Sequence, residues 1–141
     1  MQSEAGFMKG RKAEVKAVDG ALSKVPSAPA WLPKHAKAEW RRVLPQLVAD
    51  RKIAAHELST VEAYCLAVAR TREAEEALQR YGLTFESDSG PKRRPETTIL
   101  KENIEAARRL AAELGLTPAS RTKNKGGAPG DGEASEFGVD I

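Results

Sequence analysis

Two long stretches with helical periodicity, each followed by a glycine, constrain the fold of this chain most. The first predicts a helix from His56 or Glu57 to Tyr81, and Gly82 ends it because glycine adopts the left-handed backbone at no steric cost. Its apolar positions are Leu58, Val61, Cys65, Val68, Leu78 and Tyr81. The second predicts a helix from Pro95 or Glu96 to Leu114, ended by Gly115. Its apolar positions are Leu100, Ile104, Ala107, Ala111 and Leu114, and Leu110 widens the stripe.

A shorter helix is predicted ahead of these two, starting near Pro33, a residue suited to the first helical position. Its buried face is expected to hold Ala36, Trp40, Val43, Leu44 and Leu47. Lys34, Lys37 and Arg41 fall on the opposite side, and Arg42 flanks them. Pro45 interrupts the pattern and is expected to kink or end the helix just before it, because proline removes a backbone hydrogen bond.

Residues 83–96 join the two long helices and predict a short hairpin-like or irregular connector. Leu83-Thr84-Phe85-Glu86 has strand propensity, and Asp88-Ser89-Gly90-Pro91 is typical of a turn. Lys92-Arg93-Arg94 is expected to form a cationic tip.

The fold class is therefore all-α, with two long antiparallel helices, a shorter N-terminal helix and a β-hairpin-like connector. We expect residues 1–30 to form a flexible basic arm, residues 31–122 the helical core and residues 123–141 a disordered tail with an acidic end. Aromatic residues make up only 5% of the chain, so the core is thin and apolar surface is left over for packing between subunits. The expected interface residues are Leu58, Val61, Tyr64, Val68, Leu100, Ile104 and Leu110; a two- or three-helix monomer is the alternative.

Catalytic and cofactor sites have little support in the sequence. His35, His56 and Cys65 are the only histidines and cysteine; all three are read as structural, and they make no zinc pattern. The glycines of residues 126–132 lack the Gly-Lys-Ser/Thr of a phosphate-binding loop. No apolar run approaches the roughly 20 residues of a membrane helix. We therefore expect a soluble cytosolic protein with no cofactor, no metal and no membrane partner.

Clusters of basic residues are the remaining functional signal. Such clusters suit phosphate contacts, which gain affinity through counterion release and read no base sequence directly. The candidate DNA-binding residues are Lys9, Arg11, Lys12, Lys16, Lys34, Lys37, Arg41, Arg42, Lys92, Arg93 and Arg94. For any one cluster, a solvated charged face is the competing interpretation.

Four segments resemble, in order and spacing, the phage terminase small-subunit family. They are "WLPKHAKAEWRRVLPQL", "ELSTVEAYCLAVARTREAEEALQRYGLTF", "GPKRRP" and "ELGLTPASR", and together they lie within residues 30–123. In the last segment Thr117 is expected to cap a new helical turn, with Pro118 at its first position. That turn is expected to present Ser120 and Arg121 to phosphate or carboxylate groups.

The resemblance implies a protein that recognises double-stranded viral DNA, forms a homo-oligomeric ring and performs no chemistry itself. Its partner would be the terminase large subunit, which holds the packaging ATPase and nuclease, in the cytoplasm of the host cell. Arg121 matches the arginine that ends the family's Pro-x-Ser-Arg segment, and our hypothesis for it is an inter-subunit or intrachain salt bridge that holds the ring, not a DNA contact. The acidic tail, through Phe137, Val139 and Ile141, is expected to dock on the large subunit.

Two other classes of protein remain open. One is a transcription regulator that uses the first two helices as a helix-turn-helix, although the link of residues 48–55 is longer than the 3–4-residue turn of that motif. The other is an assembly adaptor without affinity for DNA.

Overall fold

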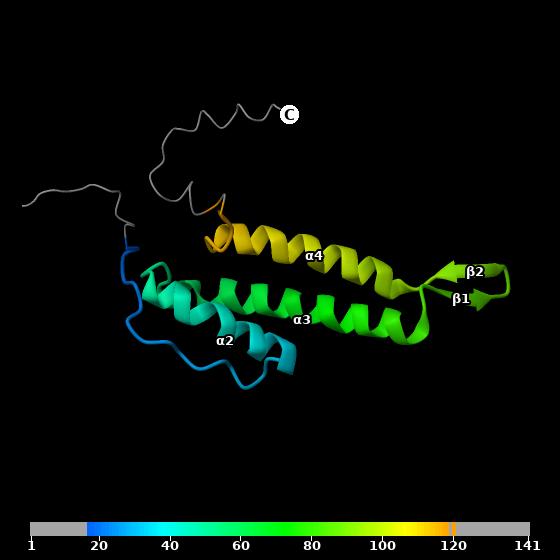
Figure 1. The fold of residues 1–141 in the computed structure, drawn as a ribbon, viewed down its shortest axis with the longest axis horizontal. Helices are drawn as coiled ribbons and strands as arrows, with labels where there is room; N and C mark the ends of the chain where they lie inside the picture. The colour runs from blue at the N-terminus through cyan, green and yellow to red at the C-terminus, as the bar shows by residue number, and fades with distance from the viewer. Residues whose placement is uncertain (1–16, 119, 121–141) are drawn as a thin grey trace, which may run out of the picture.

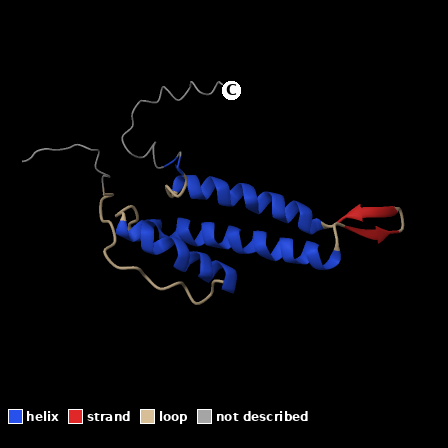
Figure 2. Cartoon of the chain, viewed as in Figure 1, coloured by secondary structure: helices blue, strands red, loops and turns tan. Residues whose placement is uncertain are grey.

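The computed structural model describes residues 17–118 and Ser120. Its elements are, in chain order, α2 (Lys34–Ala49), the 3-10 turn η2 (Ala55–Glu57), α3 (Leu58–Tyr81), β1 (Thr84–Ser87), β2 (Gly90–Arg93) and α4 (Pro95–Glu113). The described part of the chain is therefore mostly helical, with one two-stranded antiparallel hairpin (Figure 2).

The long helix α3 lies in the middle of the fold. Helix α2 packs against one side of α3, and α4 runs back antiparallel to α3 on another side (Figure 1). The β1–β2 hairpin joins α3 to α4 and projects beyond the end of the helices. This arrangement confirms the predicted pair of long antiparallel helices with a shorter N-terminal helix and a hairpin connector.

The core is concentrated between α2 and α3. The expected face of α2 is buried, including Trp40 and Leu44, and it meets Val61 and Cys65 of α3. Helix α4 is different, because it contributes no fully buried residue; Ala107, Leu110 and Ala111 are only partly buried against the core. The stripe predicted on α4 therefore reaches the core in the C-terminal half of the helix, whereas Ile104, nearer the hairpin, stays exposed.

Pro45 neither ends nor shortens α2, so the expectation of a break before it was wrong. The helix continues to Ala49, and Pro33 is its N-cap residue, not its first helical residue. Proline costs one helical hydrogen bond. The side chains on both sides of it, Leu44 and Leu47, are nearly fully buried against the core, and this burial offsets the lost bond.

Residues 17–33, which we call the N-terminal strap, run alongside α2 and hydrogen-bond to it and to the link that follows it. The amide of Val18 donates to the Arg51 carbonyl at 3.1 Å, and the amide of Leu22 donates to the Ile53 carbonyl at 2.8 Å. The indole nitrogen of Trp40 donates to the carbonyl of Pro26 at 2.9 Å. Packing against the core thus begins within residues 17–30, which the sequence assigned to a flexible arm.

The ends of the long helices follow from two glycines with positive φ, as predicted. Gly82 has φ 91° and Gly115 has φ 76°. After α4 the amide of Leu116 donates to the Ala111 carbonyl and the amide of Gly115 to the Ala112 carbonyl, which is a Schellman motif. Tyr81, in contrast, is 57% exposed, so its expected place on the apolar stripe was wrong, and the buried stripe ends at Leu78. Tyr81 is the last residue of α3, and this end of α3 extends beyond α2 (Figure 1).

Candidate nucleic-acid interface

The hairpin divides the basic run of residues 92–94 between different surfaces. In the strand register Phe85 pairs with Lys92, and Thr84 pairs with Arg93. Directly opposite residues share one face of the ribbon, and successive residues alternate between faces. Lys92 and Arg93 therefore point to opposite faces. The hairpin tip is formed instead by Asp88 and Ser89, so the expectation of a cationic tip was wrong.

Arg94 follows β2 and leads into α4, where it lies against an aromatic ring. Its guanidinium carbon is 5.3 Å from the ring centre of Tyr81, and that of Arg80 is 5.6 Å from the same centre. The amide of Arg94 also donates to the Leu83 carbonyl, which closes the base of the hairpin. Cation–π contacts of this kind hold both cations beside the hairpin.

Exposed apolar side chains at the hairpin were missed by the sequence interpretation. Leu83 is 64% exposed and Phe85 is 39% exposed, beside the exposed ring of Tyr81. This exposure could have been predicted from the sequence, because a two-stranded hairpin that no helix or sheet covers cannot bury either of its faces.

The four candidate cations of α2 do not form one equivalent patch. Lys34 is exposed. Lys37 and Arg41 line an open groove between α2 and the strap, together with Pro26, Ser27 and Pro45. Arg42 is held by Glu39, whose carboxylate accepts two bonds from its guanidinium at 2.9 and 2.6 Å. Its charge is therefore balanced inside the chain, and Arg42 is the weakest of the four as a phosphate ligand.

Glu39 is the centre of a polar cluster that ties α2 to α3. The hydroxyl of Tyr64 donates to the Glu39 carboxylate at 2.5 Å. Burial alone raises the pKa of Glu39, but the hydrogen bonds from Arg42 and Tyr64 outweigh it and hold the pKa below 4.5. Burial, with the hydrogen bond to Glu39, raises the pKa of Tyr64 to about 12. Glu39 and Arg42 therefore form an ion pair, and the Tyr64 hydroxyl completes the hydrogen bonds of the carboxylate. We interpret the role of this cluster as structural.

An open apolar groove lies between α3 and α4. It is lined on α3 by Tyr64, Val68, Thr71 and Arg72 and on α4 by Ile104, Ala107, Arg108 and Ala111. Ile104 is 50% exposed at its edge. We call this surface the α3–α4 groove. Arg72 and Arg108 at its rim were not among the predicted site residues.

The predicted interface residues separate into buried and accessible ones. Val61 is completely buried in the core, and Tyr64 is 7% exposed. Leu58, Val68, Leu100 and Leu110 are half-buried, whereas Ile104 is exposed. A second chain can reach Val68 and Ile104 through the α3–α4 groove, but Val61 belongs to the core of its own chain.

The turn after α4 has the predicted cap but not the predicted exposure. The hydroxyl of Thr117 accepts the amide of Ser120 at 3.1 Å, and the Ser120 side chain is 7% exposed. The hydroxyl of Ser120 donates to the Thr117 carbonyl at 3.0 Å, so this turn does not present Ser120 to a ligand. Several predicted site residues lie outside the described residues: Lys9, Arg11, Lys12, Lys16, Arg121, Phe137, Val139 and Ile141.

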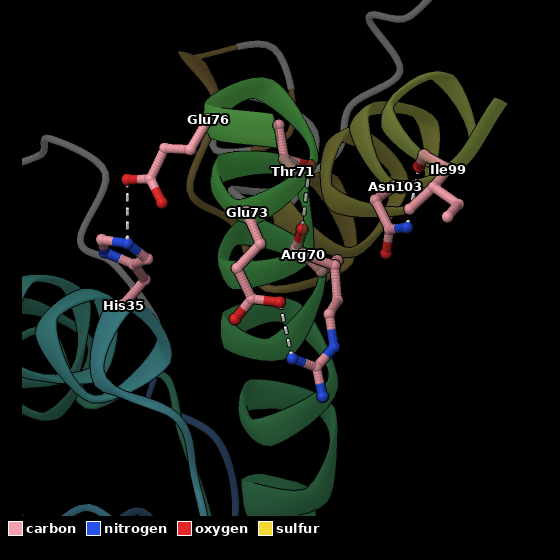
Figure 3. Close-up of polar contacts among 8 residues, drawn as sticks. His35, Arg70, Thr71, Glu73, Glu76, Ile99 and Asn103 are labelled. Atoms are coloured by element: carbon pink, nitrogen blue, oxygen red, sulfur yellow. Dashed lines mark hydrogen bonds and ion pairs between the residues drawn. The ribbon is translucent and has the colours of Figure 1, made fainter. Parts of the chain in front are cut away.

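His35 and Cys65, which the sequence analysis reads as structural residues, both lie against other parts of the fold. His35 on α2 faces Glu76 on α3 at 3.2 Å, in the same region as the Arg70–Glu73 ion pair (Figure 3). Burial, then the nearby Glu39 carboxylate, raises the pKa of the Cys65 thiol to about 12. Across residues 17–118 and Ser120, no group of three or more acidic, histidine or cysteine side chains is placed to hold a metal ion.

Comparison with known proteins identifies the family of this chain. Residues 36–131 match the family of the phage terminase small subunit, which is more than half of the 141-residue chain. No curated protein and no solved structure matches the chain. Within the described part of the chain, no helix is both long enough and apolar enough to span a bilayer. The chain therefore belongs to the phage terminase small-subunit family.

Proposed function

We propose that this chain is the DNA-binding, self-associating small subunit of a packaging terminase, acting in the host cytoplasm. Membership of the terminase small-subunit family over residues 36–131 carries the proposal. The family is generally regulatory and non-catalytic, which supports a role through binding to DNA and to a large subunit that performs the chemistry.

The α3–α4 groove is the surface that we propose for self-association. Its lining is mainly apolar, and Ile104 stands half exposed at its edge. Helix α4 buries no residue fully within its own chain, so it gains by packing against a second copy. A heterologous contact of this kind, repeated around an axis, closes a ring.

DNA binding is proposed for the exposed cations of the hairpin and of α2. Lys92 is exposed on β2, and Lys34 and Arg41 are exposed on α2. Arg93 is also exposed, but it lies on the opposite face of the hairpin, which it shares with Glu86. On the basis of their charge alone, we also propose the basic residues within positions 9–16 for DNA binding. We assign the acidic tail around Phe137, Val139 and Ile141 to docking on the large subunit. Under this proposal residues 31–122 act as the assembly and DNA-binding core, extended towards the N-terminus by the strap.

The two alternative functions are less well supported. In a helix-turn-helix regulator α3 would be the recognition helix, but it lies between α2 and α4, and residues 50–57 separate it from α2. An adaptor without DNA affinity gives no reason for the exposed cations on the hairpin.

Self-association is tested by the mass of the native assembly, measured by light scattering at micromolar concentration. We expect a defined oligomer for the wild type and a smaller species for Ile104→Glu, because a charge at this half-exposed apolar position opposes docking. Arg109→Glu is the matched control: the same residue is introduced at an exposed position of α4 outside the groove, and the mass is expected to stay unchanged. A monomeric wild type would contradict the proposal.

DNA binding is tested separately, by electrophoretic mobility shift of double-stranded DNA at low and moderate salt. We expect binding that weakens as salt rises, because phosphate contacts release counterions. No shift even at low salt would reject the DNA role and leave the adaptor as the explanation.

A further inference from the structure

Three of the large apolar side chains that remain exposed are gathered at the base of the hairpin. Tyr81, Leu83 and Phe85 are 57%, 64% and 39% exposed. They lie within five positions of the chain, where α3 gives way to β1. Exposed apolar groups in a cluster indicate a binding surface, whereas scattered ones do not.

The strand register gives the hairpin two chemically different faces. Phe85 and Lys92 are paired and share one face, to which Leu83 also contributes because it lies two residues before Phe85. The other face holds the pairs Thr84–Arg93 and Glu86–Pro91, so its cation is accompanied by a carboxylate. The first face, which we call the Phe85 face, is apolar and cationic and carries no acid.

We infer that the Phe85 face inserts into a groove of double-stranded DNA, with Phe85 and Leu83 against sugars and base edges and Lys92 on a phosphate. The inference deepens the DNA-binding role proposed above and rests on it. A two-stranded ribbon fits the major groove of B-DNA, and apolar side chains on ribbons and arms also enter minor grooves. The hairpin can reach a groove because it projects beyond the helices (Figure 1).

The charges on the hairpin limit how it approaches DNA. Asp88 at the tip and Glu86 on the opposite face are both exposed and repel phosphates. Contact is therefore confined to the half of the hairpin near the helices, where Arg80 and Arg94 flank Tyr81. These two arginines add positive potential beside the Phe85 face and position the base of the hairpin.

The test compares two single-charge losses on adjacent residues, Lys92→Ala and Arg93→Ala. Affinity of the full chain for double-stranded DNA is measured by fluorescence anisotropy across a salt series. We expect Lys92→Ala to reduce the salt slope by about one phosphate contact and Arg93→Ala to leave it nearly unchanged. Equal effects of the two variants would overturn the inference, because both would then act through net charge alone.

The apolar contribution is tested with Phe85→Ala and, as a control at an exposed apolar position on α4, Ile99→Ala. The proposed contact buries the Phe85 ring against DNA, so its loss is expected to lower affinity by roughly fivefold at every salt concentration, without a change in slope. Unchanged affinity for Phe85→Ala would overturn the inference while wild-type binding would still support the proposed function. Wild-type protein that fails to bind DNA would reject the proposed function itself.

The same variants are examined for assembly, because an apolar face also suits a second copy of the chain. We expect Phe85→Ala to keep the native mass of the wild type. A smaller species would assign the Phe85 face to contact between copies and overturn its role in DNA binding. Circular dichroism spectra equal to the wild type confirm that each variant is folded.

Discussion

Removing the hydroxyl of Tyr64 measures how strongly the polar cluster at Glu39 joins α2 to α3. In Tyr64→Phe the ring still fills its buried position, but the 2.5 Å bond to the Glu39 carboxylate is lost. Glu39 keeps its two bonds from Arg42, so its charge is still balanced. A hydrogen bond to a charged group contributes about 1.5–3 kcal/mol, and we expect the free energy of unfolding to fall by that amount.

The assay is urea unfolding followed by far-ultraviolet circular dichroism. The protein concentration is kept fixed, because the proposed self-association would also stabilise the folded chain. Tyr81→Phe is the matched control. Tyr81 is 57% exposed, and we expect its variant to stay within about 0.5 kcal/mol of the wild type. Equal losses for Tyr64→Phe and Tyr81→Phe would refute the role of the cluster.

The pH dependence gives a second check on the same variant. The pKa of Glu39 is lower in the folded chain than its ordinary value of 4.5. Stability from the ionised carboxylate is therefore complete above pH 4.5 and is lost as the pH falls through the folded pKa. The cost of Tyr64→Phe is expected to drop towards the ~1 kcal/mol of a neutral hydrogen bond in that acidic window. A cost that does not change between neutral and acidic pH would show that the carboxylate is not the acceptor that matters.

Two further predictions concern the helix end and the buried thiol. Gly82→Ala is expected to destabilise the fold by about 1–3 kcal/mol through backbone strain alone, because Gly82 has φ 91° and ψ 175° and a Cβ there meets no atom within 4 Å; an unchanged urea midpoint would contradict this. Cys65 is expected to resist alkylation by iodoacetamide at pH 8 until urea unfolds the chain, since its thiol is buried and its pKa is raised to about 12; rapid labelling of the folded protein, followed by mass spectrometry, would disprove it.

The helices were predictable because their signals are local. Helix α3 is marked by the spacing of its apolar residues, and the glycines that follow α3 and α4 mark where each helix ends. These signals do not depend on which other elements pack against the helices. The turn at Thr117 was predictable for the same reason, since its cap hydrogen bond to Ser120 lies within four residues.

Features that depend on distant packing were not predictable in this way. The α2 helix passes through Pro45 because its neighbours are buried against α3, which no local rule includes. The strap is ordered by bonds such as that from Trp40 to Pro26, fourteen positions apart in the chain. Composition alone gave residues 17–30 the character of a flexible linker.

The basic run of residues 92–94 shows why the candidate binding site could be predicted only in part. Three adjacent cations suggest one patch in the sequence, but a strand sends consecutive side chains to opposite faces. Lys92 therefore joins Phe85, Arg93 faces away, and Arg94 rests on Tyr81. Counting charges in the sequence locates this segment, but only the strand register shows on which surface each of its cations lies.

The three helices are buried to different extents, and this difference separates the structural surfaces of the chain from its candidate binding surfaces. In the described part of the chain, the buried apolar residues from Leu32 to Leu78 belong to the strap end, α2, the link after it and α3. After Leu78, Leu114 is the only described residue that joins them in the core. The α2–α3 unit is thus closed by its own chain, through apolar packing and the Glu39 cluster. Helix α4 and the hairpin, in contrast, leave apolar side chains exposed to water, namely Ile99, Ile104, Leu83 and Phe85. Exposed apolar side chains that lie together favour a binding role for these two elements. Substitutions in the α2–α3 unit should therefore act mainly on stability, whereas those on α4 and the hairpin should act mainly on assembly and DNA binding.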